Sequence, residues 1–344
     1  MKHLYLCFLA ASVLLLSSCD NADKTAKLVT LNGLTMGTTY EVKYVEPVGS
    51  QAQFGSMQLH SKIDELLINI NQLMSTYIAD SELSLLNQAP ADITFPISEQ
   101  TNYVIQEAQK LNVLSEGMLD ITVGPLVNLW GFGPSAKPEK VPTSEQLSKV
   151  SQFVGIDKFR LENRGVTKSH ENVYIDLSTI AKGYGVDAIA ELLESFGINN
   201  YLVEIGGELR VSGYKSVGQD WLIAIEKPIS DKRAVQRIIS IGDGALASSG
   251  DYRRYYEEDG IRYSHLIDPK TGYPIQHKLV AVTVVSDKSI HADGLATALI
   301  VMGKEKGMEL ANKEGIAALF ITKEMNEFVE YQSEVYASRV KTIQ

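Results

Sequence analysis

An aspartate and a threonine one helical turn apart could together bind a metal ion. Asp293 and Thr297 fall within residues 289–302, an apolar run expected to be helical. At this spacing their Cβ atoms would lie about 5–6 Å apart on one face. A carboxylate and a hydroxyl are hard oxygen donors that suit Mg²⁺, whose shell is completed by phosphate oxygens and water. A purely structural role stays open for both residues. An Asp near a helix start interacts favourably with the helix dipole, and a Thr hydroxyl can donate a hydrogen bond to the carbonyl four residues earlier.

A lysine near the start of a second expected helix indicates a phosphate ligand. We expect a strand at Val173–Leu177, ended by Asp176, and a helix over residues 179–196 capped by Ser178 or Thr179. Lys182 would then lie in or near the first turn. A cation there opposes the helix dipole unless an anion is bound between them.

A glycine pattern in the same stretch resembles a dinucleotide-binding fingerprint but does not fit its structural context. Gly183, Gly185 and Ala188 match Gly-x-Gly-x-x-Gly/Ala. That fingerprint needs its first glycine in the tight turn directly after a strand. Apolar spacing from Ile180 onward indicates that the helix has already begun, so a nicotinamide site is not favoured.

A histidine and a group of aromatic residues are weaker candidates. His265 ends an expected strand before the turn Asp268-Pro-x-x-Gly272, and histidine suits removal of a hydroxyl proton near neutral pH. Met36, Tyr77 and the segment 130–132 could enclose a flat ring. A lone histidine is more often structural, and sulfur and aromatic groups are more often core.

The N-terminus has the pattern of a lipoprotein signal. Lys2 precedes thirteen mostly apolar residues, 4–16, which are too few to span a bilayer. Leu16-Ser-Ser-Cys19 matches a bacterial lipobox, in which Cys19 becomes the lipidated N-terminus. We expect a signal peptide over 1–18, a tether over 19–27 and one folded domain over 28–335. Asp20 favours retention in the inner membrane, facing the periplasm; a plain secretory signal is the alternative.

The composition sets limits on the class of protein that must position these residues. The 344 residues are 44% hydrophobic and 22% charged, as in globular proteins, and the net charge of −10 argues against general nucleic-acid binding. Six His and two Cys do not suit a zinc ribbon or a disulfide scaffold. Helical and alternating patterns interleave without a repeat, which predicts a mixed α/β fold with mixed sheets and flanking helices.

Helices and strands are expected along most of the mature chain. Besides those already named, we expect helices over 58–74, from Ser98, from Thr143 with a Thr143–Gln146 capping box, and from Lys304. The expected strands are 28–34, 38–45, 201–205, 209–214, 222–226, 237–241, 252–257, 261–266, 280–285, 317–322 and 327–331.

Seven short motifs occur in one order along the chain, and together they resemble the ApbE family. They are Met36-Gly-Thr-Thr-Tyr40, Asp120-Ile-Thr-Val-Gly-Pro125, Asp176-Leu-Ser-Thr-Ile-Ala-Lys-Gly183, Glu204-Ile-Gly-Gly-Glu208, Ser249-Gly-Asp-Tyr252, His265-Leu-Ile-Asp-Pro269 and His291-Ala-Asp293 with Thr297. The resemblance extends over residues 28–331. Its members are FAD:protein FMN transferases, many of them anchored facing the periplasm.

The resemblance implies a reaction, a cofactor and a set of site residues. FAD is split in a cleft between sub-domains, FMN is attached to a Ser or Thr of an acceptor protein, AMP leaves, and Mg²⁺ is required. Typical acceptors are subunits of the sodium-pumping NADH:quinone oxidoreductase and of the Rnf complex. His265 would be the general base. The implied FAD contacts are Met36, Tyr77, Leu119, Asp120, Ile121, Asp176, Lys182 and Ile267, and the implied Mg²⁺ ligands are Asp293, Thr297 and the backbone of Thr179 and Ala296.

Three other functions stay open on the sequence. The same site with water as acceptor would make an FAD pyrophosphatase that releases FMN and AMP. A non-catalytic flavin-binding lipoprotein would need the aromatic residues but neither His265 nor the pair Asp293 and Thr297. A flavinylated carrier would need an acceptor motif, and we find no good copy.

Overall fold

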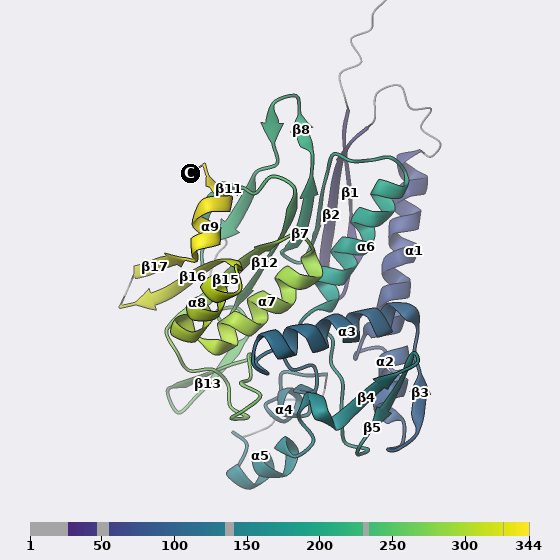
Figure 1. Ribbon diagram of the computed structural model, residues 1–344, viewed down its shortest axis with the longest axis vertical. Helices are drawn as coiled ribbons and strands as arrows, with labels where there is room; N and C mark the ends of the chain where they lie inside the picture. Colours follow the sequence, from purple (N-terminus) through teal and green to yellow (C-terminus); the bar gives the residue numbers. More distant parts are fainter. Residues whose placement is uncertain (1–26, 47–54, 135–140, 230–233, 326, 344) are drawn as a thin grey trace, which may run out of the picture.

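The largest element of the fold is an eight-stranded antiparallel sheet (Figure 1). The computed structural model describes residues 27–46, 55–134, 141–229, 234–325 and 327–343. In spatial order the strands are β1 (Leu28–Thr35), β2 (Thr38–Val45), β6 (Tyr201–Ile205), β7 (Glu208–Ser212), β12 (Gly244–Gly250), β15 (Leu279–Ser286), β16 (Ala317–Glu324) and β17 (Glu327–Gln332). Strands distant in sequence therefore meet side by side and bring their motifs together.

The two faces of this sheet are covered differently. Helices α1 (Ser56–Met74), α6 (Ala181–Ser195), α7 (Ser289–Met302) and α8 (Lys304–Lys313) lie on one face. The other face packs against a small sheet of β10 (Ile223–Glu226), β11 (Val235–Ser240) and β18 (Lys341–Thr342), and against α9 (Glu334–Arg339). Helix α7 is almost wholly buried, which explains why its sequence is apolar on every side.

A smaller unit lies below the helices in Figure 1. Its helices are α2 (Glu82–Gln88), α3 (Glu99–Leu114), α4 (Gly124–Leu129), α5 (Ser144–Ser151) and the short 3₁₀ turn Ile156–Lys158. Its sheet contains β3 (Thr94–Pro96), β5 (Gly165–Lys168) and β4 (Phe159–Glu162). Two hairpins complete the fold: β8 (Tyr214–Ser216) with β9 (Gln219–Asp220), and β13 (Tyr255–Glu258) with β14 (Ile261–Ser264).

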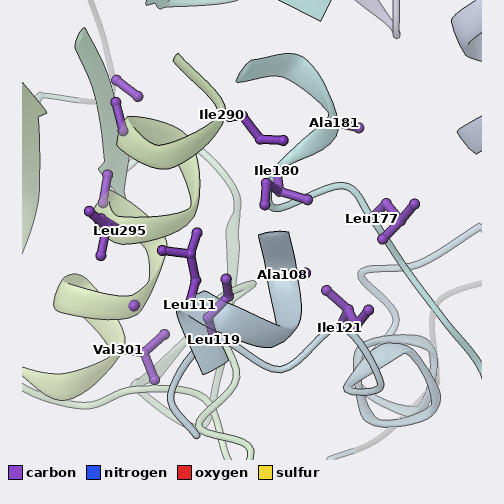
Figure 2. Close-up of a cluster of buried hydrophobic side chains, with 14 of the residues drawn as sticks. Ala108, Leu111, Leu119, Ile121, Leu177, Ile180, Ala181, Ile290, Leu295 and Val301 are labelled. Atoms are coloured by element: carbon purple, nitrogen blue, oxygen red, sulfur yellow. The ribbon is translucent and has the colours of Figure 1, made fainter. Parts of the chain in front are cut away.

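One continuous core joins this smaller unit to helices α6 and α7. Leu111 of α3 and Leu119 from the following loop pack beside Ile180 and Leu295 (Figure 2). Gly294 permits this contact, because a Cβ there would lie only 2.5 Å from Leu111. The core therefore fixes the smaller unit against the two helices that carry Lys182 and Asp293.

The predicted helix starts are largely confirmed. Ser98 caps α3 by accepting from the Thr101 amide, and Thr143 forms the expected reciprocal capping box with Gln146 at the start of α5. The capping prediction for α6 was wrong: neither Ser178 nor Thr179 caps it, and its N-cap position is Ile180. The prediction that Lys182 lies in the first turn is confirmed.

The predicted strand at 173–177 is wrong, although the segment is extended and alternately buried. Its backbone pairs with a side chain instead of a neighbouring strand. The Asn87 amide group donates to the Ile175 carbonyl and accepts from the Ile175 amide, both at 2.8 Å. Asp176 therefore does not end a strand; its amide donates to the carbonyl of Ile121 at 2.7 Å.

The remaining differences concern short elements and strand direction. Sequence patterns missed α2, α4, α9 and β12, and the short strands β3, β4, β5, β8, β9 and β18; these elements are short or rich in small residues. The mixed α/β class is confirmed, but all strand pairs in the described ranges are antiparallel, so the sheets are not mixed in direction. No helix in those ranges is long and apolar enough to cross a membrane. The signal peptide, Cys19 and nearly all of the tether lie outside the described residues.

Candidate active site

A cavity of about 1030 Å³ lies between the main sheet, helices α6 and α7, and the smaller unit. Its volume is at the upper end of the range for ligand pockets, about 300–1,000 Å³, which suits a dinucleotide. Most of the residues singled out from the sequence line it: Met36, Tyr77, Leu119, Asp120, Asp176, Thr179, Lys182, His265, Ile267, Asp293 and Thr297. The fold therefore gathers motifs from across the chain at one cavity.

Three charged side chains meet at one side of the cavity. The Lys182 ammonium lies 2.6 Å from Glu208 and 3.8 Å from Asp293, and both carboxylates are buried. Burial raises the pKa of Asp293 to about 7, with Lys182 opposing the shift and Glu208 adding to it. Burial opposes protonation of Lys182, but the two carboxylates outweigh it and raise its pKa. Because the carboxyl groups of Asp293 and Glu208 outnumber the single ammonium of Lys182, this side of the cavity can attract a further cation.

Close packing of α6 on α7 sets the position of Asp293. The Gly183 amide donates to Asp293 Oδ2 at 2.9 Å. A Cβ at Gly183 would lie 2.4 Å from the Ser289 carbonyl oxygen, so only glycine permits this approach. Asp187, one turn further along α6, accepts from the amides of Ser289 and Ile290 and so caps α7. The glycine pattern that resembled a nucleotide fingerprint thus serves helix–helix packing.

The oxygen atoms around Asp293 fit a hard divalent cation. Asp293 and Thr297 both line the cavity from one face of α7, as predicted. Thr297 Oγ1 lies 3.2 Å from Ser249 Oγ, and Thr179 Oγ1 is buried without a hydrogen-bond partner in the described part of the chain. The Gly183 amide, the usual helical donor to the Thr179 carbonyl, is engaged by Asp293 instead. In the same ranges no three His, Cys, Asp or Glu residues cluster as a cage. Such a donor set suits Mg²⁺, which takes its remaining ligands from phosphate and water.

His265 lies in the same cavity, directly after β14. Its Nδ1 lies 3.1 Å from the Arg254 carbonyl oxygen, which can only accept a hydrogen bond. Nδ1 must therefore carry the proton, and Nε2 of the neutral ring is free to accept one. Burial, with further contributions from Arg254 and Lys182, lowers the pKa of His265 to about 4. The ring is consequently neutral near pH 7, as a general base must be.

A row of three aromatic rings packs next to His265. The Phe132 ring packs edge-on to the imidazole with centroids 6.3 Å apart, and it stacks on Tyr256 at 5.5 Å. The Tyr256 ring in turn packs against the Tyr263 ring, with centroids 5.4 Å apart. The Arg254 guanidinium donates to the Phe132 carbonyl. The segment containing Phe132 is thus fixed to the hairpin that holds His265.

The candidate flavin contacts lie on loops around the cavity. Met36 occupies the tight turn between β1 and β2 with φ of 49°, and Gly37 follows with φ of 73°, as a two-residue hairpin turn requires. Tyr77 is 65% exposed, so its ring is open to a ligand at the cavity rim. Asp120 and Ile267 are buried where they line the cavity.

Similarity to known proteins agrees with this arrangement. The sequence model of the ApbE family matches residues 36–320. The chain belongs to the ApbE family. The FAD:protein FMN transferase of Vibrio cholerae is 51% identical over 326 residues, covering 95% of this chain and 96% of that protein. The corresponding protein of Haemophilus influenzae is 47% identical over 339 residues, covering 96% of each. The solved structure of the flavin transferase ApbE from Vibrio cholerae superposes with a TM-score of 0.84 at 50% identity, covering 91% of this chain and 99% of that chain.

Two residues assigned from the ApbE resemblance do not line the cavity. The side chains of Ile121 and Ala296 are buried in the core that joins the two units. Only their backbone could serve a ligand, and the Ile121 carbonyl already accepts from Asp176. Cys19 lies outside the described residues.

Several cavity residues of this family member were not identified as functional from the sequence. Glu208 and Ser249 stand within quoted motifs, so their position was signalled but their roles were not. Phe132 lies in the segment 130–132, which was predicted to enclose a flat ring and not to pack against the histidine, and Arg254 had no signal. Their roles arise because the segment 130–134 meets the β13–β14 hairpin, a contact between distant parts of the chain.

Proposed function

We propose that this chain is a FAD:protein FMN transferase that requires Mg²⁺ and releases AMP. The observation that carries the proposal is the shared cavity: His265, Lys182, Asp293 and Thr297 come from three motifs and line one dinucleotide-sized space. Membership of the ApbE family and the named activity of its relatives support the same reaction.

The proposed reaction exchanges the phosphoanhydride bond of FAD for a phosphoester bond to the acceptor. A Ser or Thr hydroxyl of the acceptor attacks the phosphorus on the FMN side of FAD. A bond forms between that hydroxyl oxygen and the phosphorus, while the bond from the phosphorus to the bridging oxygen breaks. AMP leaves with the bridging oxygen, and the hydroxyl proton passes to the histidine. The reaction is redox-neutral and needs no further reactant.

Asp293 and Thr297 would hold the Mg²⁺, with the Thr179 carbonyl as a further donor. The cation would supply charge neutralisation at the diphosphate, where negative charge builds up as AMP departs. Asp293 Oδ2 is held by the Gly183 amide, and Oδ1 has Lys182 only at 3.8 Å, so Oδ1 is the oxygen left for a metal. Lys182 adds a fixed positive charge on the same side of the cavity.

His265 would remove the proton from the acceptor hydroxyl through Nε2. The Arg254 carbonyl fixes the tautomer and the ring orientation through Nδ1. Because the ring stays neutral near pH 7, no activating deprotonation is needed before the acceptor arrives. The flavin would contact Met36 and Tyr77, while Asp120 and Asp176 line the cavity beside them.

We further propose that the enzyme works at the periplasmic face of the inner membrane, anchored by lipid on Cys19. The lipobox pattern and Asp20 support this location. The acceptors would be subunits of the sodium-pumping NADH:quinone oxidoreductase or of an Rnf-type complex, which the family resemblance favours.

One assay tests the activity and its alternatives. The purified protein is incubated with FAD, MgCl₂ and an acceptor subunit, and the acceptor is then analysed by mass spectrometry. We expect a mass increase equal to bound FMN, together with one AMP per modified acceptor. Free FMN and AMP without an adduct would identify a pyrophosphatase instead. Tight flavin binding without turnover would identify a non-catalytic flavin-binding protein.

A further inference from the structure

The β8–β9 hairpin stands apart from the main sheet (Figure 1). Two of its apolar side chains are exposed. Val217, in the turn between the two strands, is fully exposed, and Tyr214 is 58% exposed. Lys215 between them is also exposed. Tyrosine is enriched at membrane–water interfaces, and a lysine can lay its stem along apolar surface while its ammonium stays among the headgroups.

Three hydrogen bonds connect this hairpin to the place where the chain enters the fold. The Glu46 amide donates to the Lys27 carbonyl, and the Val45 amide donates to the Asn200 carbonyl, each at 2.9 Å. The side chain of Asn200 accepts from the Tyr214 amide at 2.9 Å. The start of the folded domain and the base of the hairpin therefore lie at the same end of the molecule, as Figure 1 also shows for β1 and β8.

The length of the tether limits how far this end can lie from a membrane. Eight residues, 20–27, separate Cys19 from the first strand. At about 3.3–3.6 Å per residue they reach at most about 29 Å when fully extended. The opposite end of β1 leads into Met36, which lines the active-site cavity. The eight residues of β1 span about 27 Å at about 3.4 Å per residue.

We propose that the β8–β9 hairpin rests on the lipid bilayer in which Cys19 is anchored, through Val217 in its turn and through Tyr214 and Lys215 on β8. This contact orients the molecule so that β1 leads away from the membrane and holds the cavity more than one strand length from the lipid surface. The proposal rests on the lipid anchoring proposed above, but not on the transfer reaction.

The lipid anchor on Cys19 explains how so small a hairpin surface can bind the bilayer. Two apolar side chains bury too little area to bind a bilayer from solution. Once Cys19 is anchored, the hairpin is held close to the same bilayer. Its contact with lipid then benefits from a high effective concentration. The hairpin therefore sets orientation, while the lipid supplies affinity.

A fluorescent probe on the tip tests this contact. The full-length lipidated protein with Val217→Cys is labelled with an environment-sensitive nitrobenzoxadiazole fluorophore. The mature chain has no other free thiol once Cys7 leaves with the signal and Cys19 is acylated. Ile93→Cys is the matched control: Ile93 is 57% exposed and lies next to β3, at the opposite end in Figure 1. Both proteins are reconstituted into vesicles of phosphatidylethanolamine and phosphatidylglycerol.

We expect emission at position 217 to rise severalfold on reconstitution and to be quenched by spin-labelled lipid, with no change at position 93. Equal responses at the two positions would overturn the proposal. Vesicle flotation separates the possible failures. Flotation without a signal at 217 would refute the hairpin contact alone, whereas loss of flotation would refute the anchoring and the contact together. Flavin transfer measured on the same samples shows whether the catalytic proposal holds independently.

Discussion

The Gly183 amide donates a 2.9 Å hydrogen bond to the Asp293 carboxylate, and so links the first turn of α6 to the second turn of α7. The same backbone segment carries Thr179 and Lys182, which line the cavity beside Asp293. One close helix–helix contact therefore positions the metal candidate, the phosphate-binding lysine and a backbone donor together.

Replacing Asp293 with alanine should abolish metal-dependent transfer. Removal of the only carboxylate in the proposed metal site should lower the rate at least about 100-fold at any practical Mg²⁺ concentration. Transfer is measured by in-gel flavin fluorescence of the acceptor. Glu107→Gln is the control, because this buried carboxylate contacts His291 of α7 outside the cavity; it should retain most of the activity. Normal Mg²⁺-dependent transfer by Asp293→Ala would refute the metal assignment.

His265→Ala should slow transfer by about 10²–10⁴-fold and leave FAD affinity largely unchanged, because it removes the base and not a binding contact. In the wild type, His265 has a pKa of about 4, so its ring remains neutral from pH 7 down to well below pH 6. Protonation of His265 should therefore reduce kcat/KM only as the pH approaches about 4. An acid limb near pH 6.5 that disappears in His265→Ala would show an unperturbed histidine, and lost FAD affinity would indicate a binding role.

Phe132→Ala should raise the pKa of His265. The ring packs against the imidazole and excludes water from it, so its removal favours the charged form. We expect the pKa of His265, followed by NMR titration of its imidazole, to rise by about one unit. Phe132→Leu, which keeps an apolar side chain in place, should raise this pKa less. An unchanged His265 pKa in both variants would contradict a role for this ring.

Gly183→Ala should destabilise the fold and weaken the metal site together. The added methyl group would meet the Ser289 carbonyl at 2.4 Å, and relief requires the two helices to separate. Urea unfolding should show a loss of about 1–3 kcal/mol, and half-maximal transfer should require more Mg²⁺. Gly55→Ala, where a Cβ meets open space, should leave the Mg²⁺ requirement unchanged. A stable Gly183→Ala enzyme with normal Mg²⁺ dependence would rule out this role.

Local patterns predicted the parts of the fold that local physics controls. The spacing of apolar residues located α1, α3, α6 and α7 to within a few residues, and side-chain chemistry located the caps at Ser98 and Thr143. The pair Asp293 and Thr297 shares a helical face because a helix repeats every 3.6 residues. The same local reasoning failed at 173–177, where the partner of the extended backbone is the distant side chain of Asn87.

By itself, the sequence determined which residues have the chemistry: a carboxylate and a hydroxyl one turn apart, a lysine at a helix start and a histidine after a strand. Only the tertiary structure decided that Glu208 pairs with Lys182, that the Arg254 carbonyl fixes the tautomer of His265, and that Phe132 shields it. The physical reason is range. Helical periodicity and capping act within a few residues, whereas burial, charge pairing and pKa shifts depend on segments that only folding brings together.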